Sequence, residues 1–185
     1  SSSNQSSSNP NKHEIEAKLS QLKRVALNEQ RLNKKLMTMK TGKPVVFGDV
    51  IQLLHVKSQS FLTISPNTLA KQERENIRVC LVENGNPYSW LEFMPRFKYD
   101  KEGQQILHEN ECHIRVHERP SEFIHAARKV SKFSSAGNRE INCSLENSVW
   151  TISIFQQCWE AKSKNILCGQ LVSLQETETS SFLGV

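Results

Sequence analysis

The apolar residues of the first forty positions recur at steps of three and four, which is the spacing of one face of an α-helix. The members of this stripe are Ile15, Leu19, Leu22, Val25, Ala26, Leu32, Leu36 and Met39. The pattern weakens near Asn28, where a turn would divide the segment into a helical hairpin. Gly42 and Pro44 end the helical region. Residues 11–42 are therefore expected to form a helical arm, as one helix or as a hairpin.

After Pro44 the sequence changes to short apolar stretches separated by polar turns, and one pattern of stretches recurs. The segment GDVIQLLHVKSQSFLTI at 48–64 resembles GQLVSLQETETSSFLGV at 169–185, and CHIRVHERPSEFIHA at 112–126 repeats nearly the same apolar positions between them. The pattern thus returns about every 60 residues. Each copy is typical of two strands joined by a turn.

The first two copies are each followed by a second pair of strands, at 77–81 with 89–93 and at 140–145 with 149–155. In both pairs a tryptophan, Trp90 or Trp150, opens a strand of alternating apolar positions. Such units of four short strands indicate an all-β fold of the β-trefoil type, preceded by the helical arm. The expected core residues are Leu53, Phe61, Leu62, Val79, Trp90, Phe93, Ile124, Trp150, Ile152 and Ile154.

A complete trefoil has three units, and this sequence supplies two units and the opening hairpin of another. The missing strands are expected either before Ser1 or after Val185. Residues 1–10 are rich in Ser and Asn and are expected to be a disordered tail or linker. The domain prediction is thus a tail at 1–10, an arm at 11–42, a trefoil region at 43–162 and the opening hairpin of a next trefoil at 163–185.

The positive charge of the chain is concentrated in the predicted arm. Nine basic and three acidic residues lie between Lys12 and Lys43, a net charge of +6, while the whole chain carries +5. Such a segment suits nucleic acid, anionic lipid or an acidic protein surface, or it is a solvated helix face. Single-strand nucleic-acid binding is disfavoured because no aromatic residue is interleaved with these charges.

The residue types that carry catalysis or bind metals form no recognisable motif. His108, Cys112, His113 and His117 lie close in sequence, but His113 and His117 are four strand positions apart, about 13 Å, and so cannot share one ion. The five cysteines are odd in number and irregularly spaced, which favours a reducing compartment. We expect no enzyme activity, no catalytic residue, no metal and no cofactor.

The segment FGDVIQLLH at 47–55, with FLT at 61–63, resembles the inositol trisphosphate receptor family of calcium-release channels. The resemblance continues through Ile77-Arg78-Val79, the turn at 85–90, FMP at 93–95, FIHA at 123–126 and EIN at 140–142. It covers roughly residues 43–185 and lies in the amino-terminal suppressor domain of the family, which is a trefoil with a helical arm inserted after its first unit. The shorter arm and the weak similarity over 98–111 depart from the family pattern.

The resemblance implies a regulatory module of a homotetrameric, ligand-gated channel, on the cytosolic face of the endoplasmic reticulum or a related calcium-store membrane. In the family, inositol trisphosphate is bound by an Arg/Thr/Gly-rich loop that lies beyond Val185, so no residue of this chain is assigned to that ligand. The loop after the first Trp strand contacts the neighbouring subunit, and residues 95–103 occupy its place. The implied contact residues are Pro95, Arg96, Phe97, Lys98 and Tyr99.

Two other functional classes remain open from the sequence. Related trefoil units, known as MIR units, occur as accessory modules of protein O-mannosyltransferases, whose catalytic part is a multispanning membrane domain. A free-standing trefoil that binds sugar is the other alternative, although Trp90 and Trp150 are placed as core residues rather than as exposed platforms. The sequence that flanks this chain would separate these classes.

Overall fold

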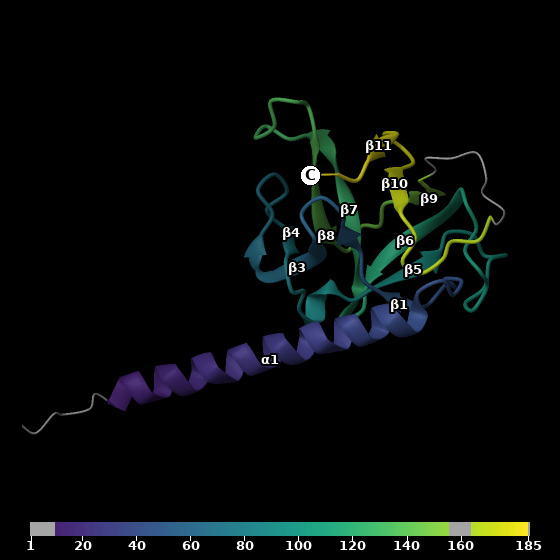
Figure 1. Ribbon diagram of the computed structural model, residues 1–185. Coiled ribbons are helices and arrows are strands. Elements are labelled where there is room, and N and C mark those ends of the chain that lie inside the picture. The colour runs from purple at the N-terminus through teal and green to yellow at the C-terminus, as the bar shows by residue number, and fades with distance from the viewer. Residues whose placement is uncertain (1–9, 156–163, 185) are drawn as a thin grey trace, which may run out of the picture.

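The computed structural model describes residues 10–155 and 164–184, and it consists of one long helix and a curled antiparallel sheet of eleven strands (Figure 1). Helix α1 spans Pro10–Lys40. The strands are β1 (Val50–Ile51), β2 (Leu54–His55), β3 (Ser60–Leu69), β4 (Ile77–Val82), β5 (Leu91–Pro95), β6 (Asn110–Val116), β7 (Arg119–Val130), β8 (Arg139–Ser144), β9 (Trp150–Ile154), β10 (Val172–Glu176) and β11 (Ser181–Phe182). The predicted all-β fold with a helical arm is confirmed.

The sheet runs in the order β11-β10-β9-β6-β7-β8-β4-β3-β2, and β5 joins β6 to β1. The strands predicted at 77–81, 140–145 and 149–155 are found as β4, β8 and β9. The strand expected at 89–93 begins two residues later as β5, because residues 87–89 form a 3₁₀ turn that Asn86 caps through its side chain.

A ring of three backbone hydrogen bonds, the closing ring, joins three segments that lie outside the named strands. Val45 N–H donates to Ile166 O at 2.8 Å, Ile166 N–H donates to Ile106 O at 2.9 Å, and Ile106 N–H donates to Val45 O at 2.9 Å. The three residues are separated by the repeat interval, and all three side chains are buried. The internal repeat of the sequence is therefore an approximate threefold arrangement in space, as a trefoil requires.

The last hairpin belongs to the same sheet as the preceding strands. Strand β10 pairs with β9, and Ile166 and Leu174 lie in the same core as Trp150. The predicted boundary between residues 162 and 163 lies outside the described residues and stays a prediction. That residues 163–185 open a further trefoil in a longer protein stays a prediction.

Most of the predicted core is buried as expected. Leu62, Phe93, Ile124, Trp150, Ile152 and Ile154 lie in the core, and Leu53 and Val79 are partly buried against it. The prediction was wrong for Phe61 and Trp90, which are only half-buried. Trp90 precedes β5 and faces α1, where its indole Nε1 donates to Glu29 Oε1 at 2.9 Å. Trp150, by contrast, is buried and donates to Ile124 O at 3.1 Å.

Helix α1 is continuous, so the alternative of a helical hairpin with a turn near Asn28 is wrong. Neither Gly nor Pro interrupts its interior, and residues with good helix propensity outweigh the local loss of apolar pattern. Its C-terminal half lies along the sheet and its N-terminal end projects beyond it (Figure 1). Residues 1–9 of the predicted tail lie outside the described residues, and Pro10 is already helical.

Among the described residues, three polar contacts attach α1 to loops and turns beside the sheet. Besides the bond from Trp90 to Glu29, Asn33 Nδ2 donates to Asn84 O at 3.2 Å and Lys40 Nζ donates to Asp49 Oδ1 at 3.0 Å. Within the described chain, no helix combines the length and apolar character that a membrane span needs.

Replacing Ile106 by Ala tests how much the side chains of the closing-ring residues contribute to the core. Ile106 is fully buried at the centre of the three repeats, so the cavity left by Ile106→Ala should lower the free energy of unfolding by about 3 kcal/mol. The next residue, Leu107, is exposed, and Leu107→Ala should cost less than about 1 kcal/mol. Urea denaturation monitored by circular dichroism measures both. Equal losses would show that the Ile106 side chain contributes no more to the core than its exposed neighbour.

Candidate interaction site on the loop after strand 5

The loop at 95–103 leaves the end of β5 and presents an ordered aromatic pair. The rings of Phe97 and Tyr99 stack, with centroids 5.0 Å apart and planes 7° from parallel. Phe97 is 36% exposed and Tyr99 is 72% exposed. An offset stack of this kind stabilises both side chains in one orientation while leaving apolar area accessible to a partner. The structure therefore brings these two predicted site residues together.

Arg96 joins this pair to strand β6. Its guanidinium carbon lies 5.0 Å from the centroid of the Phe97 ring, and its Nη1 forms an ion pair with Glu111. A guanidinium above an aromatic face is attracted to the ring electrons. Glu111 was not among the predicted site residues, because its partner is fifteen positions away and the pairing depends on the register of β5 with β6.

The remaining predicted residues differ in their roles. Pro95 is the last residue of β5 and pairs with Cys112, so it belongs to the sheet. Lys98 is exposed and makes no hydrogen bond or ion pair with the described residues. Among these five residues, Arg96, Phe97 and Tyr99 thus form one connected cluster, and Lys98 adds a solvated charge beside it.

The second end of the loop is fixed against the closing ring. Gly103 N–H donates to Phe47 O at 2.9 Å, and Gln104 Nε2 donates to Asp100 Oδ1 at 3.2 Å. Gly48 has a φ of +86°, and a Cβ there would lie 2.7 Å from Glu102 Cγ. Only glycine suits this close approach. Both ends of the loop are therefore anchored to the rigid part of the fold.

Strand β5, which carries the loop, is held by a largely buried carboxylate. Glu92 accepts a hydrogen bond from Arg115 Nε at 2.8 Å, and its Oε1 lies 2.5 Å from His117 Nδ1. Burial by itself raises the pKa of Glu92, but the hydrogen bonds to His117 and Arg115 outweigh it and hold the pKa below the ordinary value of 4.5. These contacts hold β5 against β6 close to the point where the loop begins.

The histidines and cysteine considered as metal ligands have separate partners. His113 Nδ1 lies 2.9 Å from Ser148 O, His117 contacts Glu92, and His108 Nδ1 accepts from Ile154 N–H at 3.3 Å. Burial raises the pKa of the Cys112 thiol well above its ordinary value, which disfavours the thiolate that metals bind. Across 10–155 and 164–184, no group of three or more potential ligands is arranged to hold a metal.

The curled sheet of repeated hairpins defines a protein of the β-trefoil type. The sequence matches the family described as "Inositol 1,4,5-trisphosphate/ryanodine receptor" over residues 2–161, and the chain belongs to this family. The inositol 1,4,5-trisphosphate receptor itr-1 of Caenorhabditis elegans is 26% identical over 171 residues. That match covers 89% of this chain but only 6% of the relative, so the chain spans a small part of the length of that relative.

Two solved structures share the fold at low sequence identity. One is a Caenorhabditis elegans protein of unknown function, with a TM-score of 0.63 and 16% identity over 76% of this chain and 78% of the other. The second is the SDF2-like protein of Arabidopsis thaliana, with a TM-score of 0.63 and 21% identity over 76% of this chain and 77% of the other. These two similarities establish the architecture of the sheet and carry no functional assignment.

Removing the charge of Glu92 gives a pH-dependent test of the strand that carries the loop. Because the folded-state pKa is depressed, Glu92 stabilises the fold above about pH 4.5, and this contribution is lost as the pH falls through the folded pKa. Glu92→Gln should therefore cost about 2 kcal/mol at pH 7, and the difference from wild type should shrink at pH 3. Urea titrations at the two pH values measure it. A difference that is the same at both would refute the ion-pair role.

Proposed function

We propose that this chain is the regulatory amino-terminal module of an inositol trisphosphate-gated calcium-release channel. Membership of the receptor family supports this role, and so does the 26% identity to itr-1, of which the match covers 6%. The module acts without enzymatic activity, on the cytosolic face of the endoplasmic reticulum or a related calcium store. It adjusts ligand affinity and couples ligand binding to gating in a homotetramer.

The loop at 95–103 is the surface through which this coupling is proposed to pass. The observation that carries the assignment is the stacked, exposed pair of Phe97 and Tyr99 with Arg96 over one ring. Aromatic residues and arginine dominate the energy of protein interfaces when they enter pockets of a partner. The ordered stack also lowers the conformational entropy lost on binding. The neighbouring subunit, with its ligand-binding core, is the proposed partner.

Coupling then follows from a difference between channel states. If the aromatic pair is buried against the neighbour in one state more than in another, ligand binding and loop contact bias the same equilibrium. Such coupling is reciprocal and typically amounts to about 1–3 kcal/mol. Deleting the module should therefore change ligand affinity as well as gating.

Tyr99→Ala in the full-length channel separates interface energy from folding. Tyr99 makes one stacking contact and is mostly exposed, so the melting temperature of the module should change little. Loss of a buried interface aromatic should weaken the coupled state by about 2 kcal/mol, which is about thirtyfold in the gating equilibrium. Single-channel recording and thermal melting measure the two effects. Lys101→Ala, an exposed change in the same loop, is the matched control, and a Tyr99→Ala channel that gates normally would exclude the proposed contact.

The module on its own is expected not to bind inositol trisphosphate. Lys71 and Arg74 line a shallow hollow, but the backbone N–H groups of Lys71 and Gln72, at 2.7 and 2.6 Å, already donate to the Glu140 carboxylate. A carboxylate therefore occupies the amides that a phosphate would need, and it repels anions. Calorimetry with residues 1–185 should show no binding at about 1 mM ligand. Micromolar affinity would place the ligand site within this chain.

A further inference from the structure

A polar cavity of about 130 Å³ opens between the turn that precedes β4 and strands β7 and β8. Its lining consists of Glu73, Glu75, Asn76, His125, Arg128, Ser144 and Glu146. No residue of the aromatic loop at 95–103 contributes to it. Three carboxylates face one arginine here, so the cavity carries negative charge within a basic chain. Its volume equals about four water molecules.

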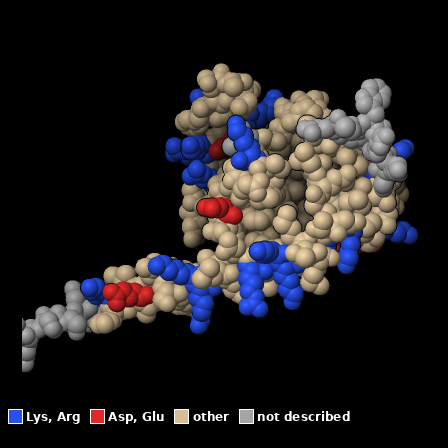
Figure 2. Space-filling view, viewed as in Figure 1, with Lys and Arg blue, Asp and Glu red and all other residues tan. Residues whose placement is uncertain are grey.

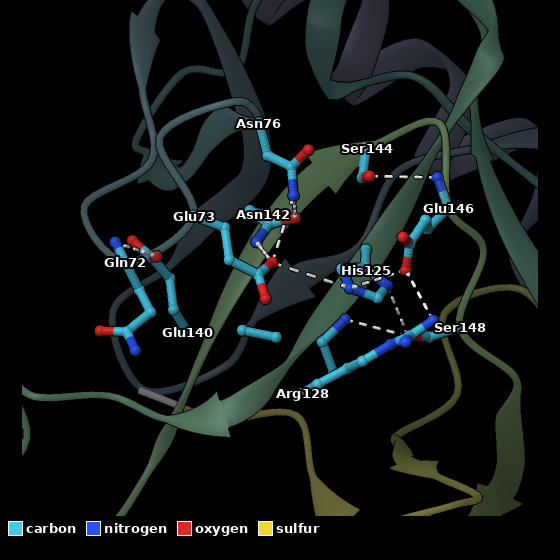
Figure 3. Close-up of polar contacts among 12 residues, drawn as sticks. Gln72, Glu73, Asn76, His125, Arg128, Glu140, Asn142, Ser144, Glu146 and Ser148 are labelled. Atoms are coloured by element: carbon cyan, nitrogen blue, oxygen red, sulfur yellow. Dashed lines mark hydrogen bonds and ion pairs between the residues drawn. The ribbon is translucent and has the colours of Figure 1, made fainter.

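His125 is the buried residue at the base of this cavity. Its side chain is 7% exposed, and its Nδ1 lies 3.1 Å from Ser148 Oγ. The second ring nitrogen, Nε2, has no hydrogen-bond partner among the described residues. It lies 3.8 Å from Glu73 Oε2 and 4.0 Å from Glu146 Oε2, between the two carboxylates (Figure 3). Both distances exceed hydrogen-bond reach, so Nε2 faces the cavity that His125 lines without a hydrogen bond to any described residue.

The internal repeat shows that the trefoil does not itself require this histidine. In the first unit the equivalent cross-strand pair is Thr63 with Cys80, and in the second unit it is His125 with Asn142. Thr63 Oγ1 forms hydrogen bonds with Phe61 O and with Ser89 Oγ. In the second unit His125 Nδ1 has the corresponding contact, with Ser148 Oγ. The second unit therefore adds a spare ring nitrogen and a buried amide at a place where the first unit has neither.

The added amide positions one of the carboxylates. Asn142 Nδ2 donates to Glu73 Oε2 at 2.8 Å, and Asn76 Nδ2 donates to the same oxygen at 3.2 Å. Glu73 Oε1 has no hydrogen-bond partner within the described chain. Arg128 Nη2 donates a hydrogen bond to Glu146 Oε2 at 3.1 Å, so the cavity wall already contains one guanidinium (Figure 3). The Glu73 carboxylate is thus held in place by two amides, and its Oε1 is free to accept a hydrogen bond from a ligand.

We propose that this cavity binds the guanidinium group of an arginine side chain on a protein partner. A guanidinium has four non-hydrogen atoms and five N–H donors in a plane, which suits both the volume and the surplus of acceptors. Glu73 Oε1, Glu146 Oε1 and His125 Nε2 are the proposed acceptors. Carboxylates pair with arginine through strong, charge-assisted hydrogen bonds. The site is separate from the aromatic loop and gives the module a second protein contact.

Titration of the 185-residue chain with the peptide acetyl-Gly-Arg-Gly-amide tests this assignment. NMR should show a saturable shift of the His125 ring signals, with a dissociation constant on the order of 1 mM for a single side chain. The same peptide with citrulline, which keeps the shape but loses the charge, should cause no shift. Agmatine, a free amine with the same head group, should bind no more tightly than the arginine peptide.

Two variants make the test independent of folding. Glu73→Gln should weaken peptide binding by about tenfold. Because Glu73 also supports Asn76 and Asn142, Glu146→Gln is the second variant, since its side chain is mostly exposed. Glu118→Gln, an exposed change outside the cavity, should bind like wild type. Equal shifts with citrulline, unchanged binding in both cavity variants, or tighter binding of agmatine would each overturn the assignment to a protein arginine.

Discussion

The ring of hydrogen bonds that joins Val45, Ile106 and Ile166 is the constraint on which the rest of the fold depends. These bonds hold together segments that are far apart in sequence, so they define where each hairpin begins. Once the ring is formed, alternating residues along each strand must point into one shared core. The long sequence separation of these contacts also predicts slow folding relative to helical proteins of the same length.

The ring also explains why the loop at 95–103 is suited to recognition. Its second end is bonded to Phe47, next to the ring, and its first end continues β5. Side chains on a loop with two fixed ends lose little freedom when a partner binds. The basic residues of α1 gather on the side of the helix that faces away from the sheet (Figure 2), so the two surfaces are available to different partners.

The repeat and the alternation of apolar residues were sufficient to predict the sheet and most of its core from sequence. Trp90 shows the limit, because its pattern equals that of Trp150 while only the placement of α1 decides that it faces Glu29. Phe97 and Tyr99 were named from the family resemblance, but their stacking was not predictable, because residues 96–99 form bends and turns without the regular alternation of a strand. The cavity around His125 was not, because its residues come from three separate strands and turns.

The attachment of α1 has a consequence for how the molecule exchanges its amide hydrogens. Asn33 Oδ1 and Gln52 Nε2 are buried polar atoms without partners among the described residues, and the large apolar side chains of α1 are already exposed. Detaching the helix therefore exposes little apolar surface and costs far less than opening the sheet. Deuterium should enter α1 through local opening, at a rate almost independent of denaturant, while β6 and β9 exchange only on global unfolding. The arm and the sheet are thus two units of different stability within one short chain.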